Sequence, residues 1–261
     1  MTTRHALLAL ACAAVVAGSA ACGSSSPKSP SSQPASASST STGTTTKPTP
    51  TTTTSTKASP SACDDLGGTV GSDQLCKVHS EAAGYTIDMS FPVDYPDQRA
   101  LSDVLKRQRD QFVQTVSEPP VRDVPKALDI KSTTYRSGTP ETGTESVALE
   151  EYVNVGGAHP ETYYDALNFD LGKQTPITFE TLFKPGTDAV AVLDPIVENE
   201  LKNRLQGAPV DANPIGAAMY KNFAVTDDAV IFFIGQGEWT IEAAGPQQVS
   251  VPRGELAAIL A

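Results

Sequence analysis

The chain has 261 residues, a formal net charge of −11 at pH 7 and a mean hydropathy of −0.20. Residues 63–261 hold all 30 acidic residues but only 15 of the 19 lysines and arginines, which gives this stretch a net charge of −15. Such a charge argues against nucleic acid or an anionic membrane surface as its direct partner. It is compatible with a cationic partner, and equally with a charge that serves solubility alone.

The first residues are typical of an export signal. Residues 1–21 combine a basic start, an apolar run at 6–17 and small residues before Cys22. The apolar run is too short to span a bilayer as a helix, which takes roughly 20 residues. The small residues before Cys22 resemble a bacterial lipobox, although Ser19 stands where leucine is usual. We therefore predict a lipoprotein-type signal peptide and lipidation of Cys22; the alternative is a plain secretory signal with Cys22 incidental.

A low-complexity segment follows. Residues 22–62 are almost entirely Ser, Thr, Pro, Ala and Gly, without an acidic or aromatic residue. Such a composition cannot bury enough apolar surface to offset the entropy of the chain, so the segment is predicted to be a disordered tether. We expect an exported protein held by its lipid at the outer face of the cell membrane, with shedding into the medium as an alternative.

Residues 63–261 are predicted to form a single domain, because their number suits one hydrophobic core. Its two cysteines are Cys63 and Cys76. An even pair in an oxidising compartment predicts a disulfide. A metal site lacks further ligands, because only His79 is near and the cysteines are not spaced as CxxC. The sequence therefore predicts neither a metal nor a cofactor.

Apolar periodicity predicts two long helices among several strands. The predicted helices span about 97–116 and 188–205, and the strands about 85–91, 128–135, 146–155, 162–170, 223–225, 229–234 and 248–251. Pro195 lies inside the second helical pattern, where it either marks the first turn, capped by Asp194, or kinks the helix. Because strands and helices do not alternate regularly, we predict an α+β fold with a mainly antiparallel sheet and two principal helices.

The loop between the strands at 146–155 and 162–170 contains a candidate catalytic residue, His159. A Ser-His-acid set could form in space from His159, Ser137 or Ser146, and Asp165, but no spacing demands it. The sequence contains no GxSxG, HExxH, GxGxxG or GxxxxGK[ST] motif. The alternative is a loop histidine that bonds the backbone.

A second loop, after the strand at 229–234, holds the only tryptophan. Trp239 lies between Glu238 and Glu242, and an aromatic side chain among polar ones is typical of a partner-binding anchor. The alternative is that Trp239 covers the edge of the core. The candidate partner-binding residues of both loops are Gly156, Gly157, His159, Tyr163, Glu238, Trp239 and Glu242.

Several segments carry a resemblance to a known family. They include CDDLGG, YTIDMSFPVDYPDQ, GGAHPETYYDALNFD, ITFETLF and NFAVTDDAVIFFIGQGEW. Together they resemble the mycobacterial secreted immunogenic protein family MPT-sixty-four over residues 63–261. More distantly, the blocks GGAHP and VIFF resemble the extracellular domain of RsiV-type anti-sigma factors, which sense lysozyme by binding it.

The resemblance implies an α+β fold with a β-grasp-like arrangement, export, and a disulfide between Cys63 and Cys76. It implies no accepted catalytic residues, so none is carried over to this chain. We therefore expect a non-catalytic, antigen-like binding domain whose partner lies outside the membrane, a cationic protein such as lysozyme among the options. Two alternatives remain open: a weak serine-type esterase acting on short acyl esters, as some proteins of this group are described, and a purely structural envelope lipoprotein.

Overall fold

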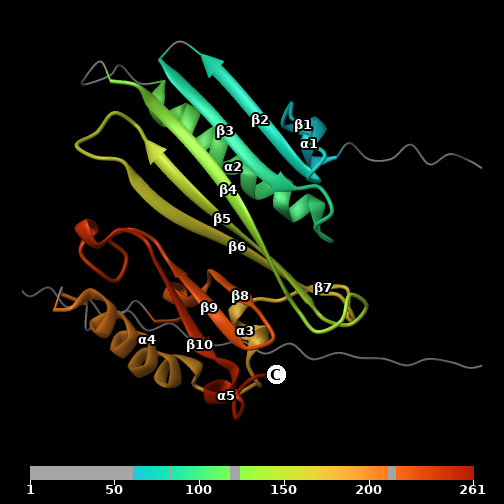
Figure 1. Cartoon of the computed structure of the whole chain (residues 1–261), viewed down its shortest axis with the longest axis vertical. Coiled ribbons are helices and arrows are strands. Elements are labelled where there is room, and N and C mark those ends of the chain that lie inside the picture. Colours follow the sequence, from blue (N-terminus) through green and yellow to red (C-terminus); the bar gives the residue numbers. More distant parts are fainter. Residues whose placement is uncertain (1–60, 83, 118–123, 208, 211–215) are drawn as a thin grey trace, which may run out of the picture. The chain divides into compact units, whose positions relative to one another are not determined.

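The computed structural model describes residues 61–82, 84–117, 124–207, 209–210 and 216–261 (Figure 1). The predicted signal peptide, Cys22 and nearly all of the predicted tether lie outside these residues. No helix within the described ranges is long and apolar enough to cross a membrane.

Seven strands form the larger sheet, and their order in the sheet is their order in the chain. They are β1 (Thr69–Val70), β2 (Leu75–Ala82), β3 (Tyr85–Pro92), β4 (Lys126–Ser137), β5 (Thr144–Asn154), β6 (Glu161–Asp170) and β7 (Thr175–Pro176). Every neighbouring pair is antiparallel except β3 and β4, which run parallel. A parallel pair needs a long crossover connection, and a helix supplies it here.

That helix is α2 (Gln98–Val116), which lies along one face of the larger sheet (Figure 1). It begins after Asp97, whose side chain accepts a hydrogen bond from the Ala100 amide at 3.0 Å and so satisfies a donor of the first turn. Its apolar stripe, which includes Leu101, Leu105 and Phe112, is buried against the sheet. The sheet side of this core comes from alternate strand residues, among them Ile87, Met89, Phe91, Leu128, Ile130, Val147 and Leu149.

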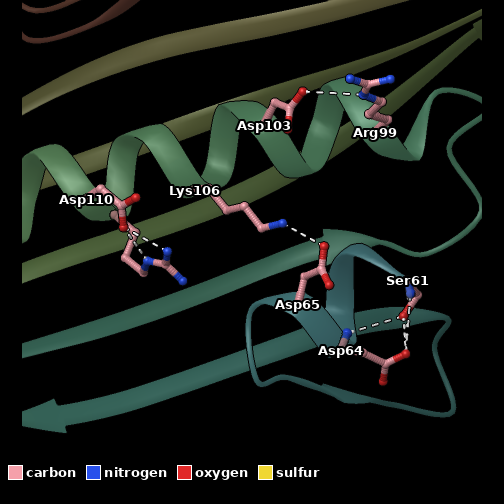
Figure 2. A network of polar contacts seen from close by, with 8 residues as sticks. Ser61, Asp64, Asp65, Arg99, Asp103, Lys106 and Asp110 are labelled. Carbon is pink, nitrogen blue, oxygen red and sulfur yellow. Dashed lines mark hydrogen bonds and ion pairs between the residues drawn. The ribbon is translucent and has the colours of Figure 1, made fainter. Parts of the chain in front are cut away.

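A disulfide and an ion pair attach the N-terminal end of the described part to the rest of the domain. The short helix α1 (Ala62–Asp65) begins after Ser61, and Cys63 forms a disulfide with Cys76 of β2. Asp65 also pairs with Lys106 of α2 at 2.6 Å, as Figure 2 shows. The disulfide predicted from cysteine counting is therefore present.

Three further strands form a second sheet, in the order β10-β9-β8. These are β8 (Phe223–Val225), β9 (Ala229–Ile234) and β10 (Gln247–Pro252), all antiparallel, and α4 (Ala189–Leu205) packs against them. The strand β9 alternates: Val230, Phe232 and Ile234 belong to the core shared with α4, whereas Phe233 faces the larger sheet. The remaining short helices are α3 (Phe179–Leu182), α5 (Arg253–Leu256), η1 (Gly216–Tyr220) and η2 (Glu242–Ala244).

The two sheets meet through a small core and several polar bonds. The apolar contact consists of Ala148, Tyr164, Ala224 and Phe233. Asn222 lies beside β6, where its side chain donates to the Tyr164 carbonyl at 2.5 Å and accepts from the Ala166 amide at 3.2 Å. The Asn222 side chain therefore makes the two hydrogen bonds to the edge of β6 that the backbone of a neighbouring strand would make.

The predicted α+β class, the mainly antiparallel sheet and the two principal helices are confirmed, whereas the β-grasp-like arrangement stays a prediction. Pro195 lies well inside α4, which begins after Asp188, so the alternative with Asp194 as the helix cap is wrong. Asp188 caps the helix instead, accepting from the Ala191 amide at 3.1 Å. Asp194 accepts a hydrogen bond from the Tyr220 hydroxyl at 2.7 Å.

Candidate functional site

Two loops far apart in the sequence meet at one end of the larger sheet. The first joins β5 to β6 and contains His159; the second follows β9 and contains Glu242. His159 Nε2 lies 3.0 Å from Glu242 Oε2, and the Gln236 amide donates to the Thr162 carbonyl at 2.8 Å. Figure 1 shows both loops on the same side of the view, the first in olive and the second in red. The structure thus brings together residues that the sequence proposed separately.

Tyr163 lies among three carboxylates of this site. Its hydroxyl donates a hydrogen bond to Glu161, and both Glu238 and Glu242 are near enough to act on it. Partial burial, the bond to Glu161 and the negative charges together raise the pKa of Tyr163 to about 12. Glu238 Oε2 also accepts from the Gly235 amide at 2.6 Å, which fixes the turn after β9.

Large apolar side chains are exposed around the same loops. Val155 and Ile241 are 39% and 46% exposed, and Tyr152 and Val124 are also exposed near this end of the sheet. We call the combined surface the loop patch. It comprises Val155, His159, Glu161, Tyr163, Glu238, Ile241 and Glu242. An acidic surface with exposed apolar side chains is suited to protein contact.

The backbone conformation of the first loop requires glycine at only one of its two glycine positions. Gly156 has a φ of +83°, which favours glycine, and a Cβ there would lie 3.2 Å from Val124 Cγ2. Gly157 shows neither feature, since a Cβ there would meet nothing within 4 Å.

Trp239 is buried, so the prediction that it anchors a partner is wrong and the alternative of a core residue holds. Its side chain is 1% exposed, and its ring meets Tyr220 edge-on with centroids 5.6 Å apart. The neighbouring residues explain the error, because Glu238 and Glu242 are exposed while the chain between them turns Trp239 into the core shared with α4.

The proposed serine-histidine set does not assemble. Ser146 is opposite Asn168 in the β5–β6 register, seven residues along β6 from Glu161, which places it ~24 Å from the end where His159 lies. Ser137 is farther still, because its partner Thr144 pairs with Asp170 at the other end of the sheet. Among the described residues, no hydrogen bond joins a serine hydroxyl to either histidine.

A buried glutamate close to a second carboxylate was not predicted from the sequence. Glu151 is 2% exposed on the face of β5 that α2 covers, and it lies close to Asp165 of β6. Burial, followed by the charge of Asp165, raises the pKa of Glu151 to about 8. Asp165 in turn accepts from Gln108 at 2.6 Å and lies 3.5 Å from Arg107. The alternation of Glu151 with Val147 and Leu149 was the available signal.

The second histidine of the domain, His79, is held in place by a carboxylate. His79 Nδ1 lies 2.7 Å from Asp88 Oδ1 on the neighbouring strand, and this hydrogen bond raises the pKa of His79. Both side chains are more than half exposed. Within the described ranges, no three His, Cys, Asp or Glu side chains converge as metal ligands.

The chain folds into an α+β domain that is similar to domains of known structure. Residues 180–254 match the family model described as "Protein of unknown function (DUF3298)". A crystal structure of a DUF3298 family member from Bacteroides fragilis superposes with a TM-score of 0.50 at 16% identity, covering 72% of this chain and 92% of that one. At this identity the likeness concerns the fold alone.

Closer relatives define the family. The "Esterase Rv3036c" of Mycobacterium tuberculosis is 43% identical over 200 residues, which cover 76% of this chain and 88% of that protein. The "Immunogenic protein MPT64" of the same species is 40% identical over 207 residues, covering 78% and 90% of the two chains. The chain therefore belongs to the MPT64 family of mycobacterial immunogenic proteins, as its sequence segments indicated.

Proposed function

We propose that this protein is an exported, lipid-anchored cell-envelope protein whose folded domain acts by binding a cationic protein through the loop patch. The proposal rests above all on one observation. The contact between His159 and Glu242 joins two loops, and these loops carry exposed Val155 and Ile241 together with the three carboxylates around Tyr163. Apolar side chains supply contact area, and the carboxylates select a positive surface.

The net charge of the domain also favours a basic protein as the partner. Residues 63–261 carry a net charge of −15, so the whole domain attracts a basic protein before contact is made. Such steering acts mainly on the association rate and weakens as salt screens the charges. The proposed interaction is therefore salt-dependent.

The carboxylate and apolar parts of the loop patch can be removed together in one double variant. We expect Glu242→Gln combined with Ile241→Ser to weaken binding of lysozyme, used as the basic probe protein, about tenfold or more by calorimetry. The matched control is Asp103→Asn, an exposed carboxylate of α2 outside the loop patch (Figure 2). Equal lysozyme affinity in the double variant and the control, or no binding to the wild type, contradicts the proposal.

Export and anchoring are supported by the disulfide between Cys63 and Cys76, which suits an oxidising compartment, and by the signal-like residues before Cys22. We expect the full chain to fractionate with membranes in a bacterial host that processes lipoproteins, and Cys22→Ser to move it to the soluble exported fraction. Membrane association that is unchanged by Cys22→Ser would rule out the lipid anchor.

A second candidate function is a weak esterase acting on short acyl esters. It is favoured by the 43% identity to a protein named as an esterase and by the His79–Asp88 pair. In that pair Asp88 holds Nδ1, which leaves Nε2 for proton transfer as in a catalytic triad. Ser90 and Thr86 each lie two residues from Asp88 on β3 and pair with Lys77 and Glu81 of the strand that carries His79, so they are the nearest hydroxyls on this face by register.

This candidate is tested with p-nitrophenyl butyrate and the purified domain. An esterase of this kind loses most of its turnover in His79→Ala and keeps it in His159→Ala, since no serine of the described residues bonds the loop histidine. Turnover unchanged by His79→Ala, or absent from the wild type, argues against it.

A further inference from the structure

We propose that a cavity at the opposite end of the larger sheet binds a small organic carboxylate with an apolar tail. The cavity has a volume of about 560 Å³, within the range of small-molecule sites. It lies between the tip of the β4–β5 hairpin, the β6–β7 turn, α3 and α5. The site is distinct from the loop patch, because Thr144 and Asp170 pair at one end of the β5–β6 register and Val153 and Glu161 at the other.

A guanidinium group with free donors lines this cavity. Arg253 donates through one terminal nitrogen only, to Ser137 Oγ at 3.0 Å and to the Thr226 carbonyl at 3.2 Å. Among the described residues no ion pair within 4.0 Å joins Arg253 to a carboxylate, and both of its hydrogen bonds come from the same terminal nitrogen, so its other terminal nitrogen and Nε have no acceptor there. A guanidinium fork of this kind matches the two oxygens of a carboxylate.

The neighbours of Arg253 hold it in place without neutralising it by contact. The Asp227 carboxylate accepts from the Gly138 amide at 2.7 Å and lies close to the Ser137 hydroxyl. These groups, together with the charge of Arg253, lower the pKa of Asp227. Ser137 and Thr226 therefore fix one terminal nitrogen of Arg253, a residue that lines the cavity.

The rest of the lining completes the match to an amphipathic acid. Thr144 also lines the cavity, but its hydroxyl oxygen is buried within the wall and has no hydrogen-bond partner among the described residues. Lys173, also in the wall, is paired with Asp170 at 3.1 Å, so among the lining side chains Arg253 is the cation without a paired acid. Ile177, Leu182 and Leu260 provide an apolar wall for a short alkyl chain.

Octanoate is the probe, because it carries one carboxylate and a tail short enough for the cavity. We expect saturable octanoate binding to the folded domain by calorimetry or ligand-observed NMR. Arg253→Gln should weaken it about tenfold or more, since a charge-assisted bond is lost. The charge-matched control Lys131→Gln, on an exposed residue outside the cavity, should change the affinity less than about twofold.

Two further measurements keep the result interpretable if Arg253→Gln unfolds. Ser137→Ala removes the acceptor that holds one terminal nitrogen of Arg253 and should weaken octanoate binding severalfold. Octanol and inorganic phosphate, titrated in parallel, separate the tail from the charge, and both should bind at least about tenfold more weakly than octanoate. Octanol binding as tightly as octanoate, phosphate binding more tightly, or affinity unaffected by both variants would overturn the proposal.

Discussion

Glu151 is the side chain whose protonation should matter most for stability. Its pKa is about 8 in the folded protein, against an ordinary value of 4.5. The folded state therefore holds a proton that the unfolded state releases, and this contribution is complete below pH 4.5 and is lost as the pH rises through about 8. We expect Glu151→Gln, which stays neutral, to gain stability over the wild type with rising pH, by up to about 4 kcal/mol.

The measurement is the free energy of unfolding in urea at pH 5 and at pH 8.5. The control is Glu141→Gln, which removes the same formal charge from an exposed position in the β4–β5 hairpin. This control should shift stability by no more than about 0.5 kcal/mol at either pH. A difference between Glu151→Gln and the wild type that is the same at both values means that Glu151 is already ionised in the fold.

Single residues were the level at which the sequence was least informative. The loops carrying His159 and Glu242 could be named from turn residues and polarity, but their contact joins positions more than 80 apart, and no local pattern encodes it. Trp239 is a second residue whose environment could not be predicted from its neighbours in the sequence. Its sequence neighbours are exposed, and only the tertiary packing against Tyr220 makes it a core residue.

Whole elements were easier to predict where periodicity was strong. The helix expected at 97–116 is α2, Gln98–Val116, because both its apolar stripe and its capping Asp97 are local signals. The strand β2 was missed: Cys76 and Val78 are buried, but the residues after them are exposed, so the alternation fades. The parallel pairing of β3 with β4 is a long-range contact and likewise had no signal in the sequence.

At this scale the disulfide should dominate the attachment of α1. It closes a loop of about 14 residues, so its loss is expected to cost about 3 kcal/mol in the chain-entropy model. For a domain of this size that loss lowers the melting temperature by roughly 6–12 °C. We expect this shift in Cys63→Ser/Cys76→Ser, measured by calorimetry.

The ion pair between Asp65 and Lys106 provides the comparison, since it joins the same helix to α2 (Figure 2). Both side chains are about a third exposed, so Asp65→Asn should cost no more than about 1 kcal/mol. If Asp65→Asn lowers the melting temperature as far as loss of the disulfide, then the ion pair, rather than the covalent link, holds α1.

At the scale of the whole domain, the two sheets are joined by few apolar side chains, so the bonds of Asn222 should carry much of the coupling. Asn222→Ala leaves the Tyr164 carbonyl and the Ala166 amide without their partner at a partly buried edge. Each of these two unsatisfied groups costs ~1–3 kcal/mol, so we expect a loss of about 2–6 kcal/mol. Asn199→Ala, on the exposed side of α4, is the matched control and should be near neutral.

Two probes distinguish coupled from separate unfolding of the sheets. The fluorescence of Trp239, the only tryptophan, reports on the core shared by α4 and the smaller sheet, while far-ultraviolet circular dichroism reports on both sheets. Because Asn222 bonds β6 directly and precedes β8, its loss should move both urea transitions by the same amount if the domain unfolds as one unit. A fluorescence transition that stays in place while the dichroism transition moves would mean that the smaller sheet and α4 are stable without the larger sheet.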